Sequence, residues 1–322
     1  MSKYKKLTTS QLIAKADQLE EAGAINEAFK CWEAIIKRES DAVYFCRFGQ
    51  LAMKLEKLSV AEDAFMSAIA LAPGLHNPFN LLGLLNLKRG NLETAYTCFK
   101  ESLRINERAP TLTFLGNLLI KLNKKEEAIN SLRKAIYLDP DYEEAYYNLA
   151  TIILDESPLE AMALLQKATA LDPNYALAHR ELGWCFRTLG QLPEGLHHLY
   201  KAIELDGSDW WSYIYLGNTL WTTGDLSSAD AAFQKAIKLS PNECTVYWCY
   251  ALFLEYEKRT GEAEELYQRG FELNPDDTML NLRFGLFLKE TGRPERAKAH
   301  LERILGSDPT NNRAKQALAD LS

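Results

Sequence analysis

Apolar residues recur along this chain at helical spacing, in short segments separated by turns. In one segment, for example, Leu112, Leu115, Leu118 and Leu119 lie at i, i+3, i+6 and i+7, and this spacing predicts a helix with one apolar face. Gly or Asn follows many such segments, at positions 23, 90, 123, 190, 224 and 292. Because both residues tolerate the left-handed conformation that ends a helix, the pattern predicts pairs of amphipathic helices joined by tight turns.

Three columns of similar residues repeat in register along almost the whole chain. Small residues occupy the first column, at Ala16, Gly49, Gly83, Gly116, Ala150, Gly183, Gly217, Ala251 and Gly285. Small residues also occupy the second column, at Ala28, Ala61, Ala95, Ala128, Ala161, Gly195, Ala229, Ala263 and Ala297. Large apolar residues form the third, at Trp32, Phe65, Phe99, Leu132, Leu165, Leu199, Phe233, Tyr267 and Leu301. Each column advances by 33 or 34 residues, so the chain contains nine repeats of one unit.

Each unit is predicted to be a helix–turn–helix. The small columns let the helices approach closely, the large residue fills the space between them, and a proline closes many units, for example Pro140 and Pro241, because it ends the second helix. One helix pair cannot bury its own apolar face. Stability therefore comes from contacts between neighbouring units.

This pattern resembles the tetratricopeptide repeat, and the segment GNTLWTTGDLSSADAAFQKAIKLSP at 217–241 matches it almost position for position. The resemblance covers 9–310 and implies an all-α fold, a right-handed superhelical α-solenoid of nine units. Unit five departs from it, with an internal turn one residue short and Pro158 at the start of its second helix. We expect residues 1–8 to form a short basic tail. We expect residues 311–322 to form a capping helix with Ala314, Ala317, Leu318 and Leu321 on its apolar stripe.

Composition and charge reduce the number of possible partners and compartments. The chain is 47% hydrophobic and 25% charged, as in a folded protein, and its net charge of −7 makes nucleic acid an unlikely partner. It has no run of about 18 apolar residues and no secretory leader pattern. Its six cysteines form no CxxC motif and are expected to be reduced structural thiols. We therefore expect a cytoplasmic protein with no membrane partner.

The resemblance also places a binding surface. In this family the first helices line the concave side of the superhelix, where partners usually bind. Large rigid aromatic side chains and amides on such a wall are typical of peptide recognition. The register places ten candidates there: Asn117, Tyr147, Asn148, Arg180, Trp184, Arg187, Tyr215, Asn218, Trp221 and Trp248. Trp211 is an eleventh candidate, expected to extend the patch at its rim.

Two interpretations of these aromatics remain open: packing between neighbouring first helices, or a groove for a peptide. The carboxylate clamp with which some family members bind acidic chaperone tails is matched only by Asn117 and Asn148. Thr113, Leu177 and Glu181 stand where the clamp needs basic residues.

The favoured function is a non-catalytic scaffold or adaptor that binds a peptide segment or a partner domain. A co-chaperone or regulatory subunit that recognises an acidic C-terminal tail is the first alternative, and a helical-repeat RNA binder is the second. No catalytic motif, cofactor or metal site is predicted, because His197 and His198 point about 100° apart on a helix and His76, His179 and His300 look isolated. Self-association through end units or convex faces stays possible.

Overall fold

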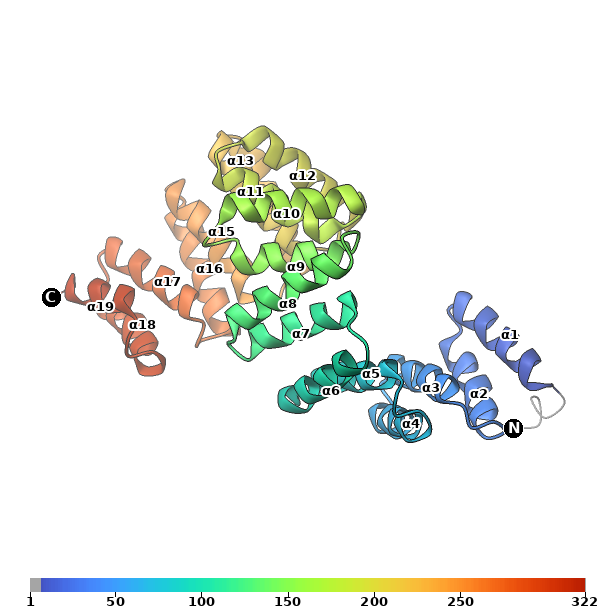
Figure 1. The fold of residues 1–322 in the computed structure, drawn as a ribbon. Helices are drawn as coiled ribbons and strands as arrows, with labels where there is room; N and C mark the ends of the chain where they lie inside the picture. The colour runs from blue at the N-terminus through green and yellow to red at the C-terminus, as the bar shows by residue number, and fades with distance from the viewer. Residues whose placement is uncertain (1–6, 322) are drawn as a thin grey trace. The chain divides into compact units, whose positions relative to one another are not determined.

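The computed structural model describes residues 7–321 and is built from helices alone in that range (Figure 1). The chain divides into two compact units, one up to Glu156 and one from Ser157 onward. The first unit contains α1 (Thr9–Glu21), α2 (Ile25–Ile36), α3 (Ala42–Lys54), α4 (Leu58–Leu71), α5 (His76–Lys88), α6 (Leu92–Ile105), α7 (Ala109–Lys121), α8 (Lys125–Leu138) and α9 (Glu143–Ile153). The second contains α10 (Pro158–Leu171), α11 (Ala176–Thr188), α12 (Leu192–Leu205), α13 (Trp210–Thr223), α14 (Leu226–Leu239), α15 (Cys244–Tyr256), α16 (Thr260–Leu273), α17 (Thr278–Glu290), α18 (Pro294–Ser307) and α19 (Asn312–Ala319).

Both units are built from antiparallel helix pairs that stack on their neighbours in the chain. The pairs are α1–α2, α3–α4, α5–α6 and α7–α8 in the first unit, and α11–α12, α13–α14, α15–α16 and α17–α18 in the second. First helices of successive pairs also touch, as in α3–α5–α7–α9 and α11–α13–α15–α17. This arrangement confirms the all-α stack of helix pairs predicted from the three columns. Most of the predicted tail, residues 1–6, lies outside the described residues.

The small and large columns meet inside each pair. A Cβ atom added to Gly49 would lie 2.4 Å from the Phe65 ring, and one added to Gly83 would lie 2.6 Å from the Phe99 ring. The same relation joins Gly116 to Leu132, Gly183 to Leu199, Gly217 to Phe233 and Gly285 to Leu301, at 2.6 to 3.1 Å. Each large side chain is therefore seated directly on the small residue 16 positions before it, and the glycine sets how close the two helices lie.

A second recurring contact joins the first helix of four repeats to the proline that ends the previous repeat. The Tyr146 hydroxyl donates to the Pro140 carbonyl at 3.0 Å, and the Tyr247 hydroxyl donates to the Pro241 carbonyl at 2.8 Å. His179 and Asn281 make the equivalent bonds to Pro173 and Pro275, at 3.1 and 2.7 Å. The carbonyl freed where the helix stops is thus satisfied by a side chain six residues later, a contact that the sequence columns do not reveal.

The turn inside each pair has one residue in the left-handed region. This residue is Gly at 23, 90, 190, 224 and 292, and Asn at 123, as predicted. In two helix pairs, α3–α4 and α15–α16, the residue at this position is instead Glu56 (φ 57°) and Lys258 (φ 63°). A side chain with a Cβ atom is strained in that conformation, so these two turns are predicted to be the weak ones.

Replacing Lys258 with Gly is therefore expected to raise the free energy of unfolding by about 0.5 to 1 kcal/mol, because the relief of strain exceeds the entropy that glycine adds to the unfolded chain. Lys258 is exposed, so little packing is lost. Urea unfolding followed by circular dichroism measures the change. The converse change, Gly224→Lys at φ 86°, should lower stability by a similar amount. A destabilised Lys258→Gly variant would contradict the strain argument.

Two local features predicted from the sequence, the start of α10 at Pro158 and the C-terminal capping helix, are present. In unit five, α9 ends at Ile153 and α10 begins at Pro158, so its second helix starts at the predicted proline. At the other end, α19 packs on α18, with Ala314 and Ala317 buried and Leu318 and Leu321 against Leu301 and its neighbours. No helix within residues 7–321 has the length and apolar character that a bilayer span requires.

All six cysteines are free and buried. Burial raises the pKa of the Cys46 and Cys244 thiols to about 11, and that of Cys185 to about 12. Because the thiolate is the reactive form, these side chains act as small packing residues, as the sequence predicted.

Candidate functional site

Four first helices of the second unit, α11, α13, α15 and α17, pack side by side in chain order. Eight of the eleven candidate residues lie on the first three of these helices. They are Arg180, Trp184 and Arg187 on α11, Trp211, Tyr215, Asn218 and Trp221 on α13, and Trp248 on α15. Every one of the eight is partly buried, neither enclosed in the core nor fully exposed. Each of these residues therefore packs partly against the protein and keeps part of its surface accessible to a binding partner.

Stacked rings connect α11 to α13. Trp184 stacks on Tyr215 with ring centroids 4.6 Å apart, Tyr215 contacts Trp211 at 5.7 Å, and Trp211 stacks on Trp210 at 4.5 Å. We call these four residues the aromatic strip. The three on α13 also pack against the buried core of the second unit. The Trp184–Tyr215 pair packs between neighbouring first helices, as the packing interpretation expects, and all four rings keep some accessible surface. The peptide groove remains a prediction.

Trp221 and Trp248 lie farther along the same row of helices. Trp221 meets the edges of Phe253 and Tyr256, at centroid distances of 5.7 and 5.2 Å, and the Tyr256 side chain is 69% exposed. Trp248 packs against the core of the second unit and stays partly exposed. These rings extend the accessible aromatic surface from α13 to α15.

Arg187 stacks on the first ring of the strip. Its guanidinium carbon lies 4.7 Å from the Trp184 ring centroid, and Nη2 is 3.5 Å from the Thr222 hydroxyl, at the outer limit of a hydrogen bond. Its Nε is buried and has no acceptor within the described chain. Burial lowers the pKa of Arg187, because the guanidinium cation loses hydration. This side chain is a desolvated cation with one unsatisfied edge.

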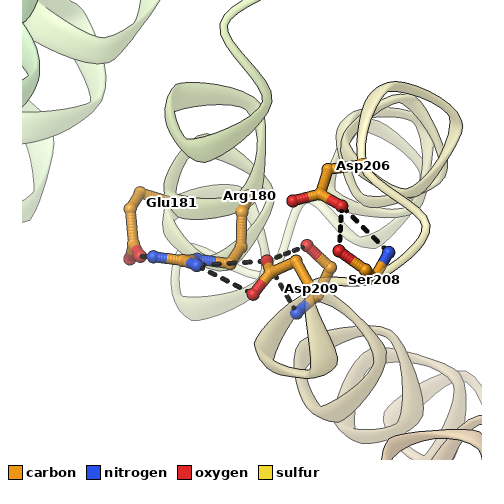
Figure 2. A network of polar contacts seen from close by, with 6 residues as sticks. Arg180, Glu181, Asp206, Ser208 and Asp209 are labelled. Atoms are coloured by element: carbon orange, nitrogen blue, oxygen red, sulfur yellow. Dashed lines mark hydrogen bonds and ion pairs between the residues drawn. The ribbon is translucent and has the colours of Figure 1, made fainter. Parts of the chain in front are cut away.

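Arg180 is held by two carboxylates of its own unit, as Figure 2 shows. It contacts Glu181 at 2.8 Å and Asp209 at 3.1 Å, and the three side chains are 13%, 10% and 15% exposed. Asp209 is also the N-cap of α13, where it accepts hydrogen bonds from the Ser212 amide and hydroxyl at 3.2 and 2.6 Å. Arg180 therefore links α11 to the start of α13. Its direct contact with a partner remains a prediction.

The loop before α13 is ordered by its own polar contacts. Asp206 accepts hydrogen bonds from the Ser208 amide and hydroxyl at 2.9 and 2.6 Å, also visible in Figure 2, and these bonds lower the pKa of Asp206.

Burial raises the pKa of Glu181 even though Arg180 opposes the shift. The sequence pattern did not indicate that Glu181 and Asp209 pair with Arg180. An Asp three residues before a Ser at a helix start was the available signal for the N-cap.

The first unit holds the other three candidates. Asn117 lies on α7, and Tyr147 and Asn148 lie on α9, which packs against α7. All three are partly buried. The Asn117 and Asn148 amides make no hydrogen bond within the described chain and, like that of Asn218 on α13, are not among its buried unsatisfied groups. Such amides are available to pair with a peptide backbone.

The expectation that His179 is isolated is wrong. Its Nδ1 lies 2.9 Å from Nδ1 of His198, and its Nε2 bonds to the Pro173 carbonyl. His198 lies 19 residues later in the sequence, on α12, which pairs with α11. The two histidines are too far apart in the sequence for their spacing to reveal this contact. Burial lowers the pKa of both rings, that of His198 to about 4. In residues 7–321 no three His, Cys, Asp or Glu side chains are placed to hold a metal ion.

Comparison with solved structures gives the same fold. A tetratricopeptide repeat protein from Parabacteroides merdae ATCC 43184 aligns with a TM-score of 0.65 at 15% identity, covering 76% of this chain and 98% of that one. The APC/C hetero-tetramer Cut9–Hcn1 aligns with a TM-score of 0.63 at 15% identity, covering 97% of this chain and 76% of its own. At this identity the likeness concerns the fold alone.

A curated relative and four family matches add sequence evidence. The peroxisomal targeting signal receptor of Saccharomyces cerevisiae is 36% identical over 70 residues, which is 21% of this chain and only 11% of the length of that receptor. Models described as TPR repeat or tetratricopeptide repeat match residues 116–154, 155–209, 212–243 and 255–321. Together with the stacked helix pairs and their repeating columns, these matches show that the chain belongs to the tetratricopeptide repeat family.

Proposed function

We propose that this protein is a non-catalytic scaffold or adaptor that binds a peptide segment or a partner domain on the first helices of its second unit. Tetratricopeptide repeats generally mediate binding between proteins, and the observation that carries this proposal is the partly exposed aromatic strip on α11 and α13. Large rigid rings that are already fixed by neighbours lose little conformational entropy when a partner covers them.

Polar groups beside the strip support an extended segment as the partner. The Asn218 amide is unpaired within the described chain, and Trp221 and Trp248 continue the apolar surface onto α15. In the first unit, Asn117, Tyr147 and Asn148 offer a second surface of the same character. An amide can pair with main-chain groups of any sequence, while the rings select apolar side chains.

The acidic-tail alternative fits the site less well. A clamp would need a basic residue at position 181, where a buried glutamate stands beside Asp209. Arg180 is already paired with both carboxylates, so this part of the site offers no free cation to hold an acidic tail. The RNA-binding alternative is disfavoured by the net charge of −7, because phosphate binding favours a basic surface.

Selection from a phage-displayed library of random dodecapeptides tests the proposal. Peptides enriched on the wild-type protein are expected to lose at least tenfold in affinity for the Trp184→Ala/Trp221→Ala variant, because buried tryptophans are frequent binding hot spots. Fluorescence anisotropy measures the affinity, and circular dichroism checks that helicity is kept. Tyr137→Ala is the matched control, since this ring is 83% exposed and lies on the second helix α8. Equal binding by the double variant would refute the placement.

A further inference from the structure

We propose that Arg187 binds the side-chain carboxylate of a Glu or Asp in the partner segment, and that the residue beside this Glu or Asp is aromatic or long and aliphatic and packs on the aromatic strip. The inference rests on the proposed function and names the chemistry that the site recognises. Trp184 and Tyr215 form the part of the strip next to Arg187.

The unsatisfied edge of Arg187 is the starting point. Its Nε is buried without an acceptor, and its only hydrogen bond within the described chain is the 3.5 Å contact from Nη2 to Thr222. A buried donor without a partner costs about 1 to 3 kcal/mol, and more when it is charged. The ring of Trp184 under the guanidinium fixes its plane but supplies no acceptor. A ligand cannot touch this buried Nε directly, but it can reach the same cation through the Nη groups, which are not among the buried unsatisfied atoms.

Arg180, the other arginine on α11, shows what a satisfied guanidinium looks like in this fold. It lies seven residues earlier on the same helix and has two carboxylate partners at 2.8 and 3.1 Å. Arg187 has no carboxylate in an equivalent place within the described chain. The same helix therefore carries one neutralised cation and one whose counter-charge must come from outside.

The shape of the free edge favours a carboxylate. The two Nη groups of the guanidinium, which are not among the buried unsatisfied atoms, form a planar fork that matches the two oxygens of a carboxylate. A phosphate carries nearly two negative charges, and an acidic chain terminus adds its own carboxylate to those of its side chains. Arg187 is a single cation, and no second cation is paired with it in the contacts of the described residues. One side-chain carboxylate is the anion that balances this site.

The strip determines the neighbouring residue. Trp184 and Tyr215 are stacked at 4.6 Å and partly exposed, so a flat apolar surface begins where the guanidinium ends. An acidic side chain that reaches Arg187 brings its sequence neighbours over these rings. Aromatic or long aliphatic side chains gain most from covering them.

The peptide selection described above tests this inference when the library is displayed as amino-terminal fusions, which offer no free C-terminal carboxylate. Wild-type protein is expected to enrich peptides with Glu or Asp next to an aromatic or aliphatic residue. A peptide so selected should lose at least tenfold in affinity when its acidic residue becomes Gln or Asn. With the Arg187→Met variant the same change should alter affinity less than threefold, while Arg187→Lys should restore part of the difference.

Each outcome separates the two proposals. Enrichment of apolar peptides without an acidic residue, or an equal loss in Arg187→Met and wild type, overturns the role of Arg187 and leaves the peptide-binding function standing. Enrichment only in a second library with free carboxyl termini shows that the ligand is a chain terminus and overturns the side-chain assignment. No enrichment in either library overturns the peptide-binding function together with this inference. Circular dichroism of both Arg187 variants confirms that they are folded.

Discussion

Replacing Gly49 with Ala is expected to lower the free energy of unfolding by about 2 to 3 kcal/mol. The added methyl group would lie 2.4 Å from Cε1 of Phe65, and the ring has no exposed surface through which to move away. Either α3 and α4 move apart or the ring leaves its rotamer, and overpacking of this kind costs about 1 to 3 kcal/mol. Urea unfolding followed by far-ultraviolet circular dichroism measures the loss.

A matched glycine and a compensating change test the mechanism. Gly261 lies in α16 with ordinary φ, and nothing lies within 4 Å of an added Cβ atom. Gly261→Ala should therefore leave stability unchanged or raise it by up to about 1 kcal/mol. The combination Gly49→Ala/Phe65→Leu should recover part of the loss, because the smaller leucine leaves room for the added methyl group. Equal effects of Gly49→Ala and Gly261→Ala would show that contact with Phe65 is not the cause.

The pairing of columns explains why the fold was predictable. Gly49 and Phe65 are 16 residues apart, and the same spacing recurs in eight of the nine repeats. It recurs because in each of these repeats a large side chain of the second helix packs on a small residue of the first. Helical periodicity then defines the buried face of each helix. Even the irregular start of α10 at Pro158 was predictable, because a proline at the first helical position is a local signal.

The site was predictable only as a set of positions. Eight candidates lie on α11, α13 and α15 and are partly exposed, and their role in binding remains a prediction. The commitment of Arg180 to Glu181 and Asp209, and the pairing of His179 with His198, depend on which side chains reach each other across helices. Spacing along one chain does not encode such contacts. Similarly, Glu56 and Lys258 occupy turn positions that composition alone assigns to Gly or Asn.

Loss of the Arg180 guanidinium is expected to have the other large effect. Arg180→Met should lower the free energy of unfolding by about 3 kcal/mol at neutral pH, because Glu181 is then left buried, 10% exposed, without its cation. Glu181→Gln alone should cost less than about 1 kcal/mol, since burial already raises the pKa of Glu181 and thus disfavours its charged form. The double variant should recover much of the loss. Chemical denaturation of all three proteins measures these values.

Two further measurements test whether the unpaired Glu181 causes this loss of stability: its dependence on pH, and a comparison with the more exposed Arg259. A carboxyl group whose folded pKa is raised contributes stability that is present below its unfolded pKa and is lost as pH rises through the folded pKa. The deficit of Arg180→Met should therefore shrink as pH falls from 7.5 toward 5, and this shrinkage should vanish in Arg180→Met/Glu181→Gln. Arg259 also contacts two carboxylates, but its side chain is 39% exposed. Arg259→Met should cost at most about 1 kcal/mol, because water solvates the carboxylates that it leaves behind.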